Sequence, residues 1–227
     1  MATSGTTTFN LDFGDIIEEA FERAGVSMRG GYSYKTAKRS LGLLLTEWSN
    51  RGINLWTLEE QSLTLLSGTG TYTLPADTID VLEAVIRNNN SDYTVTRISV
   101  STFSSIPNKT QTGQPSQYYI NRLRDAPTIT LYPRPGDTLN NQTLVYWRLR
   151  QMQDVGDNPE INQDVPIRFL PALVAGLAYQ IAMKFPEGAK KVPFLKAEYD
   201  IQFRLAEEED RERAQWSIVP SWDDYRI

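Results

Sequence analysis

Residues 33–56, SYKTAKRSLGLLLTEWSNRGINLW, contain the change of hydrophobic period that decides the fold. We expect a helix capped by Ser33 and ended by Asn50-Arg51-Gly52. Its buried face carries apolar residues at helical spacing: Ala37, Leu41, Leu44, Leu45 and Trp48. After Trp56 the apolar residues alternate with polar ones, which is typical of β-strands. The chain is therefore expected to turn from helix to sheet at this point.

A first helix is expected just before this segment. Its apolar residues also recur at helical spacing: Phe13, Ile16, Ile17, Ala20, Phe21 and Ala24. Asp12 or Asp15 can cap its start, and Gly25 is a suitable stop because glycine readily adopts the left-handed conformation. The connection through Gly30-Gly31 is short, so an antiparallel helix pair is expected.

The middle of the chain is expected to form short antiparallel strands separated by turns. The alternating segments are residues 62–65, 71–74, 81–87, 93–98, 118–123, 128–132 and 143–149. The first two are expected to pair as a β-hairpin across Gly68-Thr69-Gly70. This turn lacks the lysine and the following helix of a phosphate-binding loop. Residues 99–107 are expected to form a short helix.

Helical spacing returns after Asp164. A wide apolar face follows: Leu170, Leu173, Val174, Leu177, Ala178, Ile181 and Phe185. Pro171 requires that this helix either begins near it or kinks there. Pro193 can open a last helix that runs to about Gln215. The charged end of that helix, residues 207–213, is expected to project into solvent rather than to form a carboxylate site.

These elements predict an α+β fold. An N-terminal helix pair and a long C-terminal helix pair are expected to pack as one helical layer, beside a central antiparallel β-region. The expected domains are a discontinuous helical domain at residues 11–56 and 164–215, a β-domain at 57–163, and an extended docking tail at 216–227.

The composition excludes most kinds of catalytic site. The 227 residues include no Cys and no His, which removes catalytic triads, Cys-His pairs and zinc sites. A glycosidase needs two carboxylates across a cleft, and no sequence argument selects two of the 28 acidic residues. We therefore expect no catalytic residue, no metal site and no cofactor.

The charge and the hydropathy bear on whether the chain binds nucleic acid or contacts a membrane. Its net charge of −5 and the absence of a dense basic run argue against a free-standing nucleic-acid binder, although an acidic wall suits a channel past which DNA slides. The longest apolar stretch, residues 169–182, is too short to cross a bilayer. The N-terminus lacks a signal peptide, so we expect synthesis in the cytoplasm and no membrane contact.

The C-terminal tail is rich in large apolar residues. They are Trp216, Ile218, Val219, Trp222, Tyr225 and Ile227. Solvated tails are usually poor in such residues. Two interpretations are open, because the tail can fold back on its own core or dock in a groove of another chain, where aromatic anchors are common. The charged spacer before it favours docking.

A family resemblance is carried by short segments at residues 34–41, 43–48, 50–56, 106–109, 113–119, 130–133 and 170–178. They resemble the head-to-tail adaptor proteins of short-tailed bacteriophages, also called tail accessory factors or tail tubular proteins. The resemblance implies a virion protein that forms a ring of twelve subunits below the portal, extends the DNA channel and carries the tail nozzle. It also implies that the C-terminal tail inserts between portal subunits.

Three alternatives remain at this point. The chain can be another ring of the particle, such as a head-completion or tail-terminator protein. It can be a tail-associated, carboxylate-dependent peptidoglycan hydrolase, although no motif indicates one. It can also be a scaffold that leaves the finished particle.

Overall fold

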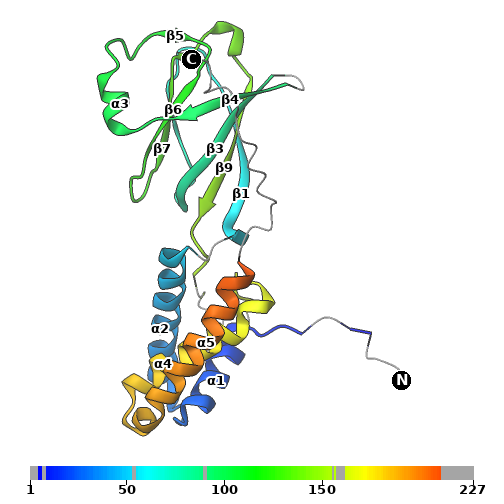
Figure 1. Ribbon diagram of the computed structural model, residues 1–227, viewed down its shortest axis with the longest axis vertical. Helices are drawn as coiled ribbons and strands as arrows, with labels where there is room; N and C mark the ends of the chain where they lie inside the picture. Colours follow the sequence, from blue (N-terminus) through cyan, green and yellow to red (C-terminus); the bar gives the residue numbers. More distant parts are fainter. Residues whose placement is uncertain are drawn as a thin grey trace, which may run out of the picture.

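The computed structural model describes residues 5–6, 9–52, 55–88, 91–154, 156 and 162–210. In this part of the chain a helical bundle lies at one end and a β-region at the other (Figure 1). The α-helices are α1 (Phe13–Ala24), α2 (Gly30–Arg51), α3 (Val100–Ser105), α4 (Leu170–Lys184) and α5 (Val192–Glu209). The strands are β1 (Leu58–Thr64), β2 (Thr71–Thr73), β3 (Thr78–Asn88), β4 (Ser91–Arg97), β5 (Thr112–Gly113), β6 (Gln117–Asn121), β7 (Thr128–Tyr132), β8 (Arg134–Pro135) and β9 (Thr143–Arg150).

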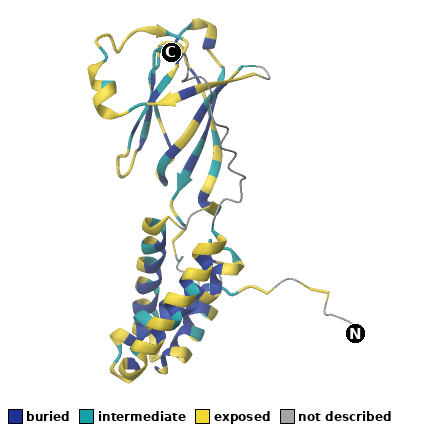
Figure 2. Ribbon diagram, in the orientation of Figure 1, coloured by how far each residue is buried: buried dark blue, intermediate teal, exposed yellow. Residues whose placement is uncertain are grey.

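Helix α4 forms the centre of the bundle, because α1, α2 and α5 each pack against it. It is buried on almost every side from Ala172 to Ala178, as its wide apolar face predicts (Figure 2). Across this core, Trp48 Nε1 of α2 donates a hydrogen bond of 3.1 Å to Tyr199 Oη of α5. The N-terminal and C-terminal helices thus share one hydrophobic core.

Most of the predicted helix ends are confirmed. Asp12 caps α1 by accepting from the Asp15 N–H, and Gly25 ends it with φ of 69°. Gly52 ends α2 with φ of 84°. The prediction that Ser33 caps α2 is wrong, because the helix begins at Gly30 and the Ser33 hydroxyl instead bonds to the Arg29 backbone.

The two helix-starting prolines are also placed as expected. Pro171 lies in the first turn of α4, so the helix begins beside it and accommodates the ring there. Pro193 occupies the same position in α5. Helix α5 ends at Glu209 with Asp210 as its cap, and residues 211–215 of the expected helix lie outside the described residues.

The strands form a curled sheet in the order β1-β9-β3-β4-β6-β7-β2, with a separate β5-β8 pair. The α+β class is confirmed, but the sheet is mixed rather than antiparallel throughout, since β4 pairs with β6 in parallel. The separate β5-β8 pair is also parallel. Its core is separate from that of the bundle (Figure 2). It contains Leu65, Leu74, Val81, Ala84, Ile86, Val95, Tyr118, Ile120, Ile129, Leu131, Leu139, Leu144 and Tyr146.

The predicted hairpin between residues 62–65 and 71–74 is wrong. Strand β1 pairs along its whole length with β9, from Leu58 opposite Leu149 to Thr64 opposite Thr143. Strand β2 pairs with β7 at the other end of the sheet. The physical reason is the length of the partner: β2 offers only three residues, whereas β9 satisfies every position of β1.

Among the described helices, none combines the length and the hydropathy that a bilayer crossing requires.

Candidate functional site

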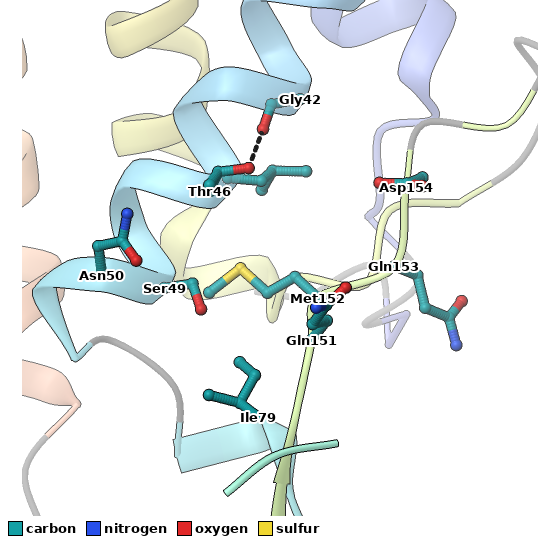
Figure 3. Close-up of a pocket in the computed structure, with 10 residues that line it drawn as sticks. Gly42, Thr46, Ser49, Asn50, Ile79, Gln151, Met152, Gln153 and Asp154 are labelled. Atoms are coloured by element: carbon teal, nitrogen blue, oxygen red, sulfur yellow. Dashed lines mark hydrogen bonds between the residues drawn. The ribbon is translucent and has the colours of Figure 1, made fainter. Parts of the chain in front are cut away.

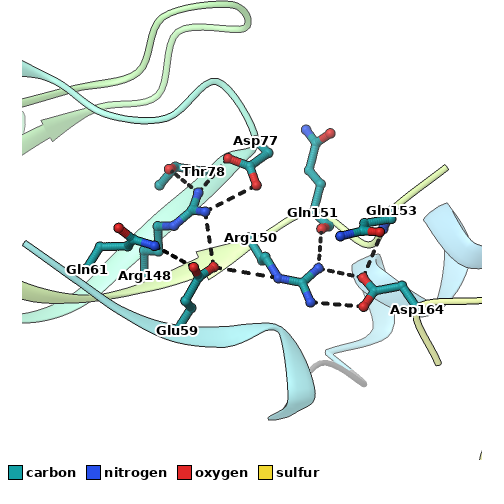
Figure 4. Close-up of polar contacts among 9 residues, drawn as sticks. All are labelled: Glu59, Gln61, Asp77, Thr78, Arg148, Arg150, Gln151, Gln153 and Asp164. Atoms are coloured by element: carbon teal, nitrogen blue, oxygen red, sulfur yellow. Dashed lines mark hydrogen bonds and ion pairs between the residues drawn. The ribbon is translucent and has the colours of Figure 1, made fainter. Parts of the chain in front are cut away.

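A group of charged side chains lies around the end of β9, at the end of the β-region that is nearer the bundle (Figure 1 and Figure 4). The chain leaves the bundle after Gly52 to enter β1, and it returns after β9 toward α4. Arg148 and Arg150, near the end of β9, bind carboxylates from the start of β1, from the turn before β3 and from the returning segment. We call this group the junction.

Arg148 is the inner arginine of the junction, with only 5% of the residue exposed. Its Nη1 donates to Asp77 Oδ1 at 2.6 Å and to Thr78 Oγ1 at 2.9 Å. Its Nη2 donates to Glu59 Oε2 at 3.1 Å and to Asp77 Oδ2 at 3.2 Å. The guanidinium therefore ties β1 and the start of β3 to β9. Its buried Nε has no hydrogen-bond partner among the described atoms.

Arg150 is the outer arginine, and it holds the returning chain. Its Nη1 lies 2.5 Å from Asp164 Oδ2, and its Nη2 donates to Asp164 Oδ1 at 3.0 Å. Asp164 also accepts the Gln153 N–H at 3.0 Å, while Glu59 Oε2 lies 3.7 Å from Arg150 Nε. The segment that re-enters the bundle is thus fastened to the end of β9.

The ion pairs change the acidity of the junction carboxylates. The Arg148 side chain donates to Asp77 and holds the pKa of that carboxyl below its usual value, against a smaller opposing effect of burial. Burial alone would raise the pKa of Asp164, but hydrogen bonds from Arg150 and Gln153 outweigh it and lower the pKa. Both carboxyls are therefore stabilised in their charged form, which suits a structural role better than proton transfer.

A pocket of about 350 Å³ lies beside the junction (Figure 3). One wall is the C-terminal half of α2, including Thr46 and Ser49, and the other is the segment from Gln151 to Asp154. Met152 points into the space between them (Figure 3). Among the described residues that line the pocket, Asp154 is the one ionisable side chain. General acid–base catalysis usually needs both an acid and a base, so this lining lacks the second group.

Residues 11–220 match a family model described as SU10 adaptor protein. The chain belongs to this family. The family consists of phage head-to-tail adaptors, so the resemblance seen in the sequence is confirmed, and this adaptor is a structural component of a phage particle. A search of curated proteins found no match.

The junction of this adaptor was missed at the level of sequence. The sequence does contain a signal for the burial of Arg148. Alternate residues of a strand point to the same face, so Arg148 shares a face of β9 with the buried Leu144 and Tyr146. An arginine at an inward position needs carboxylate partners, so acidic residues near the ends of β1 and β3 become candidates. The same rule does not identify Asp164, which lies beyond the strand.

The predicted docking residues of the adaptor, Trp216 to Ile227, lie outside the described residues. The last described residue, Asp210, directs its carboxylate to the Leu55 N–H at 3.4 Å, close to the start of β1. The last described residue therefore lies beside the segment that leads from the bundle into β1. Within the described residues, no cluster of three or more potential metal ligands is present.

Proposed function

We propose that this adaptor forms a ring of twelve subunits below the portal, extends the DNA channel and connects it to the tail nozzle. The observation that carries the proposal is the family match, which covers almost the whole chain. The net charge of −5 supports a channel wall, since like charge keeps DNA from adhering. The role is structural rather than catalytic.

We further propose that the two parts of the chain act as separate domains with the boundaries expected from the sequence. Each part has its own hydrophobic core, and the junction joins them through ion pairs rather than through a shared apolar core. A fixed angle between the two parts suits a subunit that must hold its neighbours in register around a ring.

The C-terminal tail is the proposed portal-binding segment. Trp216, Trp222 and Tyr225 supply aromatic anchors of the kind that dominate protein interfaces. Ordering such a segment on its partner costs free energy, which burial of these side chains offsets. Twelve linked contacts add avidity even where each one is weak. After synthesis in the host cytoplasm, the subunit would then join a completed head.

The experiment is reconstitution with purified portal rings, followed by electron microscopy. The wild-type adaptor is expected to form a twelve-fold ring on one side of the portal, with the tail nozzle protein binding to its free side. A ring bound elsewhere, or an adaptor lost from mature virions, would reject the proposal.

A truncation after Gln215 isolates the role of the tail. The truncated chain is expected to fold, because the residues of both described cores end at Ala206. It is expected to fail to join the portal. A matched control changes Asp223 and Asp224 to Asn in the full-length chain, which leaves the aromatic anchors intact. Normal portal binding by the truncated chain would rule out tail docking.

A further inference from the structure

One groove of the bundle combines apolar and acidic side chains. It has a volume of about 750 Å³ and runs between α1 and the N-terminal end of α4. Phe9 and Ile167 line it and are 68% and 50% exposed. Four carboxylates and Arg23 also line it. The exposed apolar residues and the four carboxylates form what we call the acidic face: Phe9, Asp15, Glu18, Glu19, Glu22 and Ile167.

The negative charge of the acidic face is only partly compensated within the chain. Glu19 accepts from Arg23 Nε at 2.7 Å, which leaves this pair neutral. Within the described structure, no ion pair is formed by Asp15, Glu18 or Glu22. Exposed carboxylates beside exposed apolar side chains are typical of a surface that a cationic, partly apolar partner covers.

A second groove has the opposite charge. It has a volume of about 420 Å³ and lies between α2 and the C-terminal end of α4. Tyr32 and Leu43 are 73% and 65% exposed, and Arg39 lies between them on the same side of α2. Lys184 lines the groove from α4. With the exposed Lys35, these residues form what we call the basic face.

The cations of the basic face lack a carboxylate partner in the described residues. Lys184 donates to the Ser40 hydroxyl, and Arg39 Nη2 to the Thr36 hydroxyl at 3.4 Å, both of which are neutral. Burial lowers the pKa of Lys184, and the charge of Arg39 lowers it further. A carboxylate supplied from outside would relieve this repulsion.

We propose that the basic face of one copy docks on the acidic face of the next copy. The proposal rests on the ring of the proposed function and names the surfaces that close it. Different elements carry the two faces, since the acidic face lies mainly on α1 and the basic face mainly on α2. The contact is therefore head-to-tail. A head-to-tail contact repeats from copy to copy and closes into a ring where the rotation allows it.

The spacing of the charges fits this contact. Lys35 and Arg39 are four residues apart on α2, and Glu18 and Glu22 are four residues apart on α1. Both pairs therefore span about one helical turn, or ~6 Å along the axis. Tyr32 and Leu43 extend beyond the cations and can cover Phe9 and Ile167, which removes apolar surface from water on both copies.

Charge reversal on one face at a time tests the proposal. Two variants are made, E18K/E22K and K35E/R39E, and a third combines all four changes in one chain. Each two-site variant is expected to lower the fraction of chains in portal-bound rings roughly tenfold or more, because like charges then meet at every contact. The four-site variant, and an equal mixture of the two-site variants, are expected to restore rings.

Controls separate this contact from general charge effects. E207K/E208K on α5 and K190E/R204E alter net charge equally at exposed positions outside both faces and are expected to leave ring formation unchanged. Circular dichroism checks that each variant folds. The inference would be overturned if either two-site variant formed rings normally. It would also be overturned if neither the mixture nor the four-site variant restored rings. Both outcomes would leave the proposed function intact. A wild-type chain that forms no ring would overturn the proposed function itself.

Discussion

Arg150 and Asp164 form a two-point ion pair that fastens the end of β9 to the segment re-entering the bundle. Their side chains are 17% and 16% exposed, so water replaces this contact poorly. Asp164 lies three residues before η3 (Ile167–Phe169), the 3-10 turn that leads into α4. The pair therefore helps to set where the bundle begins relative to the sheet.

Replacing Asp164 with Asn is expected to lower the free energy of unfolding by about 1.5–3 kcal/mol, the usual contribution of hydrogen bonds to a charged group. Glu59 remains 3.7 Å from Arg150 and limits the loss. Urea unfolding followed by circular dichroism measures the change. Asp125→Asn is the control, because its pair with Arg124 is almost fully exposed and contributes at most about 1 kcal/mol.

A double-mutant cycle with Arg150→Met and Asp164→Leu tests whether the two side chains act together. Each single change removes one partner of a largely shielded ion pair, although Arg150 keeps the more distant Glu59. The double variant is therefore expected to be more stable than the sum of the single losses predicts. Additive losses would show that the pair contributes no coupling.

Acid is expected to weaken the junction. The folded pKa values of Asp77 and Asp164 lie below their usual values. Carboxyls of this kind stabilise the fold above their unfolded pKa, and the contribution is lost as the pH falls through the folded pKa. The free energy of unfolding should therefore be steady near neutrality and fall below about pH 5. Asp164→Asn should reduce the slope in that range, and an unchanged slope would contradict the assignment.

Local signals predicted most of the elements but not their partners. Residues 128–132 form β7 with the predicted bounds, and Gly25 ends α1, because alternation and a left-handed glycine are local properties. The pairing of β1 with β9 is not local, since its register depends on residues that are 79 to 91 positions apart. A hairpin was therefore predicted where the sheet places its two strands at opposite ends.

The junction shows the same limit. The burial of Arg148 follows from strand parity, but the contact between Arg150 and Asp164 depends on the path of a connecting segment. No propensity or period specifies that path. The two charged faces were also beyond the sequence argument, since Glu18 and Glu22 belong to an ordinary polar helix face until Phe9 and Ile167 are placed beside them.

Two helical glycines are expected to respond in opposite directions to alanine. A Cβ at Gly176 would lie 2.8 Å from Tyr199 Cε2 and 2.9 Å from Leu44 Cδ2, in the fully packed centre of the bundle. Both side chains are buried, so they cannot move aside without disturbing the core. Gly176→Ala should therefore destabilise the chain by about 1–3 kcal/mol despite its better helix propensity.

Gly42 in α2 provides the matched comparison, because a Cβ there meets no atom within 4 Å. Gly42→Ala should stabilise the chain by roughly 0.5–1 kcal/mol, the usual gain in a helix interior. Urea unfolding of both variants measures the difference. A stabilised Gly176→Ala variant would contradict the prediction. Helix propensity would then decide the outcome at both positions, and α4 and α5 would pack less closely than the 2.8 Å between the added Cβ and Tyr199 Cε2 implies.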